Sequence, residues 1–235
     1  MQTSLHLIPV GLGDAPIEQW LPAETRLIAS KITVYIAENA KTARAFLKLV
    51  GTEKPIQDIT IHTLSNKTST QEIREWLKHP DSEGKIGLVS EAGCPAVADP
   101  GALVAREAHQ MGIRVVPWVG PSSILLGLMA SGLDGQRFTF HGYAPVQAQE
   151  RARQLQQWEN ISSKQNQTQL FIETPYRNLQ MFQTLLATLK PNTRLCVARA
   201  ITTENEWIKT HTIAEWKKLP APDIDKQATL FLFLA

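Results

Sequence analysis

The stretch KIGLVSEAGCPAVADPG, residues 85–101, decides the fold. It opens with a β-rich apolar run, Lys85–Ser90, and continues as a loop of small, acidic and turn-forming residues. At Pro100 it leads into an amphipathic segment, and a second β-rich run follows at Arg114–Trp118. A strand, a loop, a helix and another strand in this order are typical of a crossover unit between parallel strands. We therefore expect a parallel sheet.

The same alternation fills the rest of the first half of the chain. Further strands are expected at Ser4–Val10, Ile32–Ala37 and Thr60–Leu64. Asn39 is placed to cap a helix that ends at Gly51. Ser69 and Glu72 have the spacing of a capping box at the start of another helix.

The second half keeps strands and helices but spaces them differently. Strands are expected at 137–141, 168–173, 194–199, as a pair around 207–212, and at 228–234, with helices at 147–158 and 176–189. The polar segment 160–168 is the most loop-like stretch, and the Gly120-Pro121-Ser122 turn is the better boundary marker. These patterns predict an α/β fold with two α/β domains. Residues 1–118 would hold a mainly parallel sheet and residues 119–235 a mixed one.

Composition excludes several classes of protein. The chain has 235 residues, with 24 Lys and Arg against 22 Asp and Glu, which gives a net charge of +2. No apolar run approaches the ~20 residues of a membrane helix, and the first residues lack the basic start of a secretion signal. Cys94 and Cys196 offer neither a disulfide framework nor a zinc-binding spacing. We expect a cytoplasmic protein without a metal site or a membrane anchor.

Three loops that follow predicted strands are the candidate ligand-binding segments: 9–16, 90–101 and 120–123. In an open parallel sheet, ligands bind outside the carboxyl ends of the strands. None of these loops carries Lys or Arg or a phosphate-binding motif, and their ionisable side chains are acidic. The spacing Gly11-x-Gly13-x-x-Pro16, with Glu38 after the next strand, leaves a nicotinamide cofactor open. A cationic or zwitterionic cofactor such as S-adenosylmethionine suits the loops better.

Acidic and basic side chains near these loops are candidates for catalysis and substrate binding. Asp14, Glu38, Glu91 and His141 are the groups that would accept a proton from a hydroxyl acceptor. Lys41 and Arg44 fall on one face of the predicted helix that starts after Asn39, and Arg177 lies one helical turn after Glu173. A solvated helix face and a simple i, i+4 ion pair are the structural alternatives.

Five segments of the sequence, taken together, resemble one known protein family. They are the three loops, the Phe140-His141-Gly142-Tyr143-Ala144-Pro145 segment and the Phe171-Ile172-Glu173-Thr174-Pro175-Tyr176-Arg177 segment. In this combination the chain resembles the tetrapyrrole methylase family of S-adenosylmethionine-dependent methyltransferases, and most of all its 16S ribosomal RNA cytidine 2′-O-methyltransferase branch. The resemblance implies two α/β domains with S-adenosylmethionine in the cleft between them.

The resemblance also implies roles for residues and partners. Leu12, Gly93, Cys94, Val97, Ser122 and Ser123 would bind the cofactor, and Glu38 matches the glutamate of the Glu-Asp-Thr-Arg element of that branch. Here that element reads Glu38-Asn39-Ala40-Lys41. Catalysis is assigned to Glu38 on this match, and to Asp14 as the acid of the first loop. Substrate binding is assigned to Lys41 and Arg44, which share a predicted helix face, and to Arg177. A ribosomal RNA substrate and a homodimer are expected. A methylase of a small acceptor such as a tetrapyrrole, and a chain that binds a cofactor without activity, are the alternatives.

Overall fold

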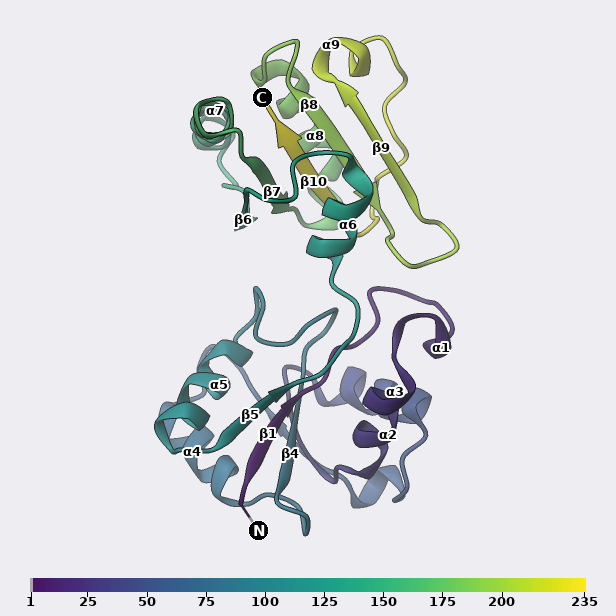
Figure 1. Ribbon diagram of the computed structural model, residues 1–235, viewed down its shortest axis with the longest axis vertical. Helices are drawn as coiled ribbons and strands as arrows, with labels where there is room; N and C mark the ends of the chain where they lie inside the picture. Colours follow the sequence, from purple (N-terminus) through teal and green to yellow (C-terminus); the bar gives the residue numbers. More distant parts are fainter. Residues whose placement is uncertain (1) are drawn as a thin grey trace. The chain divides into compact units, whose positions relative to one another are not determined.

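The protein, described here by a computed structural model over residues 2–235, divides into two compact units (Figure 1). The first extends to Ser122 and the second runs from Ser123 to Ala235. One unit contains a five-stranded parallel sheet and the other a five-stranded mixed sheet. The predicted fold class is therefore confirmed. The sequence pattern predicts a boundary after residue 118, whereas the first unit also includes the Gly120-Pro121-Ser122 turn.

The first sheet has the strand order β3-β2-β4-β1-β5. Its strands are β1 (Ser4–Leu7), β2 (Val34–Ala37), β3 (Thr60–Thr63), β4 (Lys85–Val89) and β5 (Arg114–Pro117), and all neighbours are parallel. Each lies within a predicted strand. Strand β1 ends earlier than expected, so that residues 8–10 already belong to the loop above the sheet.

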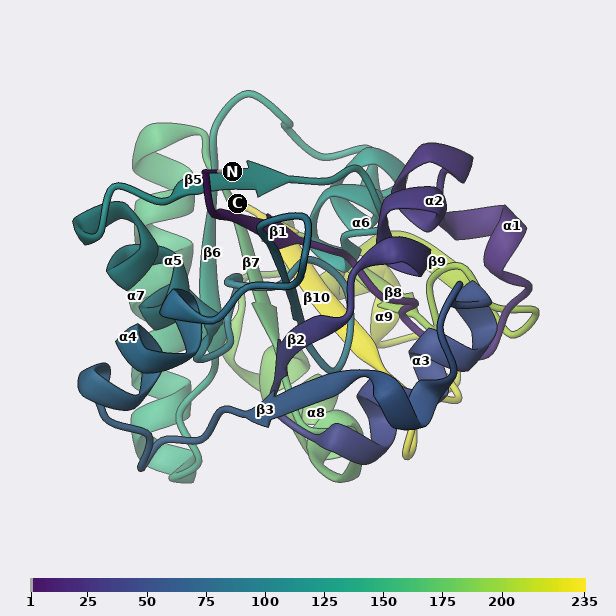
Figure 2. The same cartoon turned by 90° about the horizontal axis from the view of Figure 1, so that it is seen from below.

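Helices cover both faces of this sheet (Figure 2). One face carries α1 (Ile17–Trp20), α2 (Ala23–Lys31) and α3 (Ala40–Val50), and the other carries α4 (Thr70–Lys78) and α5 (Gly101–Gln110). The short helix η1 (Ile56–Asp58) precedes β3. Successive residues of β2 point to opposite faces of the sheet: Tyr35 packs under α2 and α3, and Ile36 packs against α4 and α5. Such burial on both faces is what a parallel sheet requires.

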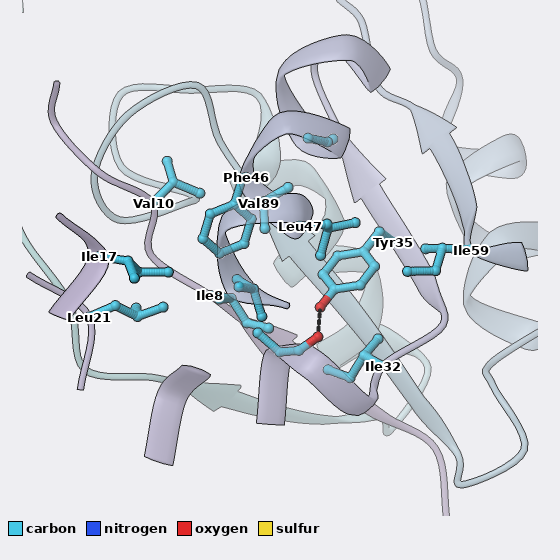
Figure 3. Packing of buried hydrophobic residues seen from close by; sticks show 14 of the residues in the cluster. Ile8, Val10, Ile17, Leu21, Ile32, Tyr35, Phe46, Leu47, Ile59 and Val89 are labelled. Atoms are coloured by element: carbon cyan, nitrogen blue, oxygen red, sulfur yellow. Dashed lines mark hydrogen bonds between the residues drawn. The ribbon is translucent and has the colours of Figure 1, made fainter. Parts of the chain in front are cut away.

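Figure 3 shows the core under α1, α2 and α3. The Tyr35 hydroxyl donates a hydrogen bond to the Ala29 carbonyl oxygen at 2.6 Å, so the one polar group of this side chain is satisfied where it is buried. Burial raises the pKa of the Tyr35 hydroxyl far above its usual range. Tyr35 thereby fixes helix α2, which was not among the expected elements, onto the sheet.

The order of the strands creates one switch point. From β1 the chain crosses past β4 to β2, and from β4 it crosses past β1 to β5. The two neighbouring strands β1 and β4 therefore send their following loops in opposite directions. In doubly wound sheets this is where the loops part and a ligand binds.

The second unit is built on the sheet β6-β7-β10-β8-β9. Strand β6 (Phe138–Tyr143) pairs in parallel with β7 (Thr168–Ile172), whereas β10 (Thr229–Leu234), β8 (Arg194–Arg199) and β9 (Trp207–Thr212) extend the sheet by antiparallel pairing. Helices α7 (Ala148–Gln165) and α8 (Asn178–Thr188) share a core with this sheet, and η2 (Pro175–Arg177) leads into α8. Helix α6 (Ser123–Ser131) lies against β10 at Gly127, and α9 (Ile213–Trp216) follows β9.

Two expectations about this unit were wrong. Residues 160–165 are the last part of α7 and not a loop, and the helix ends where Asn166 takes a left-handed φ of 48°. Its buried residues Leu155, Trp158 and Ser162 repeat at helical spacing, so the polar residues between them are simply the exposed face. The expected pair around 207–212 is the single strand β9, which pairs with β8.

None of the helices formed by residues 2–235 combines the length and the apolar composition that a bilayer crossing requires.

Candidate functional site

The loops after β1 and β4 are joined to each other directly above the switch point. The Val10 amide donates to the Gly93 carbonyl at 3.0 Å, and the Gly93 amide donates back to the Val10 carbonyl at 3.2 Å. Gly93 has a φ of 71°, where side chains are disfavoured, and a Cβ there would lie 3.2 Å from Leu12 Cδ2. Gly93 and Leu12 are therefore packed together at the carboxyl ends of the two central strands.

The loop after β5 packs onto the same pair of loops. A Cβ on Gly120 would lie 2.4 Å from Pro9 Cβ, so only glycine allows this approach. The Cys94 thiol donates to the Pro121 carbonyl oxygen at 3.4 Å, and burial raises the pKa of this thiol. The structure thus brings the first two predicted loops together with residues 120–121 of the third, all within the first unit.

The predicted cofactor-binding residues are distributed as follows. Leu12, Gly93 and Cys94 lie in the joined loops, and Val97 follows on the same loop with 48% of its surface exposed. Ser122 is the last residue of the first unit, whereas Ser123 begins α6 in the second unit. The predicted cofactor cleft between the two halves stays a prediction.

Three carboxylates gather where β2 and β4 end. Glu38 follows β2 directly; its burial raises the pKa of its carboxyl, and the negative charges of Asp99 and Glu91 raise it further. Glu91 in turn accepts a hydrogen bond from the Thr42 hydroxyl at 2.5 Å, which ties the loop after β4 to the start of α3. A half-buried carboxylate with a raised pKa is a stronger proton acceptor than an ordinary surface glutamate.

Asp14 is exposed on the first loop, and its charge is not among those that shift the pKa of Glu38. His141 lies in the second unit, where its ring stacks on Trp158 with 4.0 Å between the ring centroids. Its Nε2 donates to Gln169 Oε1 at 2.8 Å, and burial lowers the pKa of the imidazole. His141 is thus engaged in the core of its own unit.

The predicted substrate-binding cations occur in both units. Lys41 and Arg44 are exposed in the first turns of α3, which begins beside Glu38 and is capped by Asn39. Arg177 lies in η2, and its Nε donates to Glu173 Oε1 at 3.0 Å. The Glu173 side chain is buried, so this ion pair holds the guanidinium in a defined position.

Sequence reasoning missed two neighbours of Arg177. Tyr176 is 79% exposed at the tip of the same turn. The Lys226 amide donates to the Pro175 carbonyl at 3.2 Å, which brings an exposed lysine from the segment before β10 to this turn. The pairing of β7 with β10 creates this contact, and no local sequence motif predicts it.

Comparisons with known proteins support one family. The family model for tetrapyrrole (corrin/porphyrin) methylases matches residues 4–217. The chain is 31% identical to the ribosomal RNA small subunit methyltransferase I of Xylella fastidiosa (strain Temecula1 / ATCC 700964), covering 98% of this chain and 80% of the relative. It is 28% identical to the protein of the same name from Bacillus subtilis (strain 168), covering 90% of this chain and 68% of the relative.

A solved structure agrees at the level of the fold. The methyltransferase CobJ superposes with a TM-score of 0.62 at 16% sequence identity, over 99% of this chain and 94% of CobJ. The family match extends over both units and includes all three loops, which confirms the resemblance inferred from them. The chain therefore belongs to the tetrapyrrole methylase family, a family of methyltransferases.

Proposed function

We propose that this protein is an S-adenosylmethionine-dependent methyltransferase that methylates RNA. The observation that carries the proposal is the convergence of three loops at the switch point between β1 and β4. The relatives named above, which are ribosomal RNA methyltransferases, support the choice of RNA.

The loops have the chemistry that the methyl donor needs. Loops 9–16 and 90–101 contain no Lys or Arg, so no fixed cation opposes the sulfonium charge. Gly93, whose amide and carbonyl both bond to Val10, holds the first two loops together, and Leu12 offers apolar surface next to it. We assign donor binding to Leu12, Gly93, Cys94 and Val97, together with the serines Ser122 and Ser123. When bound, S-adenosylmethionine supplies an activated methyl group.

The protein's own task is then positioning and proton removal. Methyl transfer is an in-line displacement, so holding the acceptor oxygen opposite the sulfur provides much of the rate. Glu38 would accept the proton of the acceptor hydroxyl, because its carboxylate is half-buried among like charges and gains a proton readily. Asp14 is the second candidate for this role.

Lys41, Arg44 and Arg177 would contact the RNA backbone. Lys41 and Arg44 are exposed, whereas the Arg177 side chain is 25% exposed and paired with Glu173. Cations bind phosphates without reading sequence, and an exposed aromatic ring such as that of Tyr176 provides a surface on which an unpaired base stacks. The predicted homodimer and the cytoplasmic location belong to this proposal as well.

The decisive experiment is methyl transfer in vitro. The purified protein is incubated with methyl-labelled S-adenosylmethionine and either small-subunit ribosomal RNA, assembled small subunits or a tetrapyrrole precursor. Label in the RNA at a ribose 2′-oxygen, mapped by mass spectrometry, is the expected result.

One observation favours a second candidate, a methylase of a small acceptor. The net charge of +2 is low for a protein that binds RNA. Label in the tetrapyrrole and none in either RNA sample would select this candidate. Binding of the donor with no label in any acceptor would indicate a cofactor-binding chain without activity.

A further inference from the structure

The loop after β4 contains two residues in an unusual backbone conformation. Ala96 has a φ of 69° and Ala98 a φ of 62°. Residues with a Cβ rarely adopt the left-handed region, and they stay there only when the surroundings hold them. Val97, which we assign to donor binding, lies between them.

One side chain supplies the restraint. Asp99 Oδ1 accepts hydrogen bonds from the Ala96 amide at 3.0 Å and from the Gly101 amide at 2.7 Å. A Cβ on Gly101 would lie 2.8 Å from the same oxygen, so the absence of a side chain there lets the carboxylate sit on the start of α5. The single oxygen therefore ties the left-handed segment to the first residue of a helix that is anchored in the core through Val104 and Ala108.

A helix cap alone does not explain this arrangement. The N-cap position of α5 is Pro100, and the bond from the Ala96 amide lies outside the helix. Asp99 is also half-buried: burial raises the pKa of its carboxyl, while hydrogen bonds from the amides of Gly101, Ala96 and Val97 lower it. The carboxylate is thus kept in a partly desolvated position, where its partners are backbone amides of the loop.

We propose that Asp99 is a positioning residue that fixes the backbone of residues 93–98 in the shape that binds the methyl donor. It acts through the loop and not by touching the donor. The proposal rests on the proposed function, because it assumes that this loop contacts S-adenosylmethionine.

Asp99 also affects Glu38, because the Thr42–Glu91 hydrogen bond ties the loop that contains Asp99 to the start of α3, next to Glu38. Its negative charge is one cause of the raised pKa of the Glu38 carboxyl, together with burial and the charge of Glu91. The Asp99→Asn variant keeps an oxygen that accepts from the Ala96 and Gly101 amides but removes the charge. The Asp99→Ala variant removes both, so the two variants separate loop shape from charge.

The chain offers a matched control. Asp81 Oδ1 also accepts from two backbone amides, Glu83 at 2.9 Å and Lys85 at 2.8 Å, in the turn that precedes β4. This turn lies at the opposite end of the strand from the three loops. Asp81→Ala therefore removes the same kind of turn restraint without altering the donor loop.

The experiment measures binding of S-adenosylhomocysteine by calorimetry and methyl transfer to RNA over a range of pH, with wild type and the three variants. We expect Asp99→Ala to raise Kd about tenfold or more, whereas Asp99→Asn and Asp81→Ala stay within about twofold of wild type. Circular dichroism and melting temperatures report whether each variant is folded.

The pH dependence of kcat/KM in Asp99→Asn tests the charge of Asp99 separately, because a purely structural role of Asp99 would not shift it. Loss of the negative charge lowers the pKa of Glu38, so the acid limb of kcat/KM should shift to lower pH. If Asp99→Ala does not fold, Asp99→Glu carries the test of loop shape: it keeps the charge but moves the carboxylate away from the Ala96 and Gly101 amides, so it should also raise Kd about tenfold, and wild-type Kd in a folded Asp99→Glu would overturn the proposal.

The proposal would be overturned if folded Asp99→Ala bound S-adenosylhomocysteine with the wild-type Kd. It would also be overturned if Asp81→Ala raised the Kd as much as Asp99→Ala does. Both results would leave the proposed function intact. An Asp99→Asn limb that stays at the wild-type pH would overturn the effect on Glu38. Wild-type protein that binds neither S-adenosylhomocysteine nor S-adenosylmethionine would instead overturn the proposed function, and the role of Asp99 with it.

Discussion

Gly87, in the central strand β4, leaves the space that the Tyr35 ring fills in the core under α1, α2 and α3. It lies in β4 opposite Tyr35, and a Cβ there would lie 2.3 Å from Tyr35 Cε1. The Tyr35 ring is fully buried and bonded to Ala29, so it has little room to move. The absence of a side chain at Gly87 is therefore what allows the tyrosine to fill this part of the core.

We predict that Gly87→Ala lowers the free energy of unfolding by about 2–3 kcal/mol, since it overpacks a buried site. Urea denaturation measures the change. Gly135→Ala is the control, because an added Cβ at Gly135 meets no atom within 4 Å. Equal stability of Gly87→Ala and wild type would contradict the described packing of Tyr35.

Glu38 and Asp14 are the two candidate bases, and their surroundings differ. We predict that Glu38→Gln lowers the methylation rate by about a hundredfold or more, while Asp14→Asn has little effect. Both variants should bind S-adenosylhomocysteine as wild type does. Single-turnover methylation assays at neutral pH measure the difference, and the reverse ranking of the two variants would assign the base to Asp14.

The pH dependence follows from the sign of the Glu38 shift. The base must be ionised, so kcat/KM should rise with pH as Glu38 loses its proton and level off above its pKa. Because burial and the charges of Asp99 and Glu91 raise this pKa, the limb should lie above the usual range of a glutamate. A wild-type profile that is flat down to the ordinary glutamate value would argue against Glu38 as the base.

Residues in the three loops were predictable from the sequence, but their interactions were not. Gly93 and Gly120 stand out as turn residues, whereas the pairing of Val10 with Gly93 depends on the strand order. Asp99 before Pro100 has the spacing of a helix start, and its carboxylate does bond the first amide of α5, at Gly101; its additional bond from the Ala96 amide has no sequence signal. The left-handed conformation of Ala96 has no signal in its own residue type.

At the scale of elements, local capping chemistry is reliable. Ser69 and Glu72 form the predicted capping box: the Glu72 amide donates to the Ser69 hydroxyl at 3.2 Å, and the Ser69 amide donates to the Glu72 carboxylate at 2.8 Å. The hydrogen bonds from Ser69 lower the pKa of the Glu72 carboxyl.

We predict that Ser69→Ala destabilises the protein by about 1 kcal/mol, because it leaves an amide of the first turn of α4 without its cap. Thermal and urea denaturation give the value. Ser163→Ala, on the exposed face within α7, is the matched control and should leave stability unchanged or slightly raised. A cost at Ser163 as large as that at Ser69 would contradict the capping explanation.

Elements without such local signals were missed. Helices α1 and α2 are interrupted by Pro22, and the sequence 17–31 has no continuous apolar stripe that marks a long helix. They form because the crossover from β1 to β2 must cover one face of the sheet, where Trp20, Leu21 and Ala29 are buried. Tertiary packing and not local propensity determines these helices.

At the scale of the whole molecule, each unit has its own buried core and its own sheet. The fold class was predictable because alternation of strands and helices depends on periodicity, which the sequence displays directly. The strand order was not predictable, because it depends on which strands lie side by side. It is this order that places the loops after β1 and β4 next to each other.

The proposed function requires the methyl donor to bind at the three loops. Hydrogen–deuterium exchange, measured by mass spectrometry with and without S-adenosylmethionine at about 100 times its Kd, tests where it binds. We predict slower exchange in peptides that cover 9–14, 90–99 and 118–123, by more than the general slowing that follows from a stabilisation of about 2.7 kcal/mol at this donor concentration. Peptides around the Asp81 turn should show no extra protection. Donor-induced protection confined to segments outside the three loops would contradict donor binding at these loops.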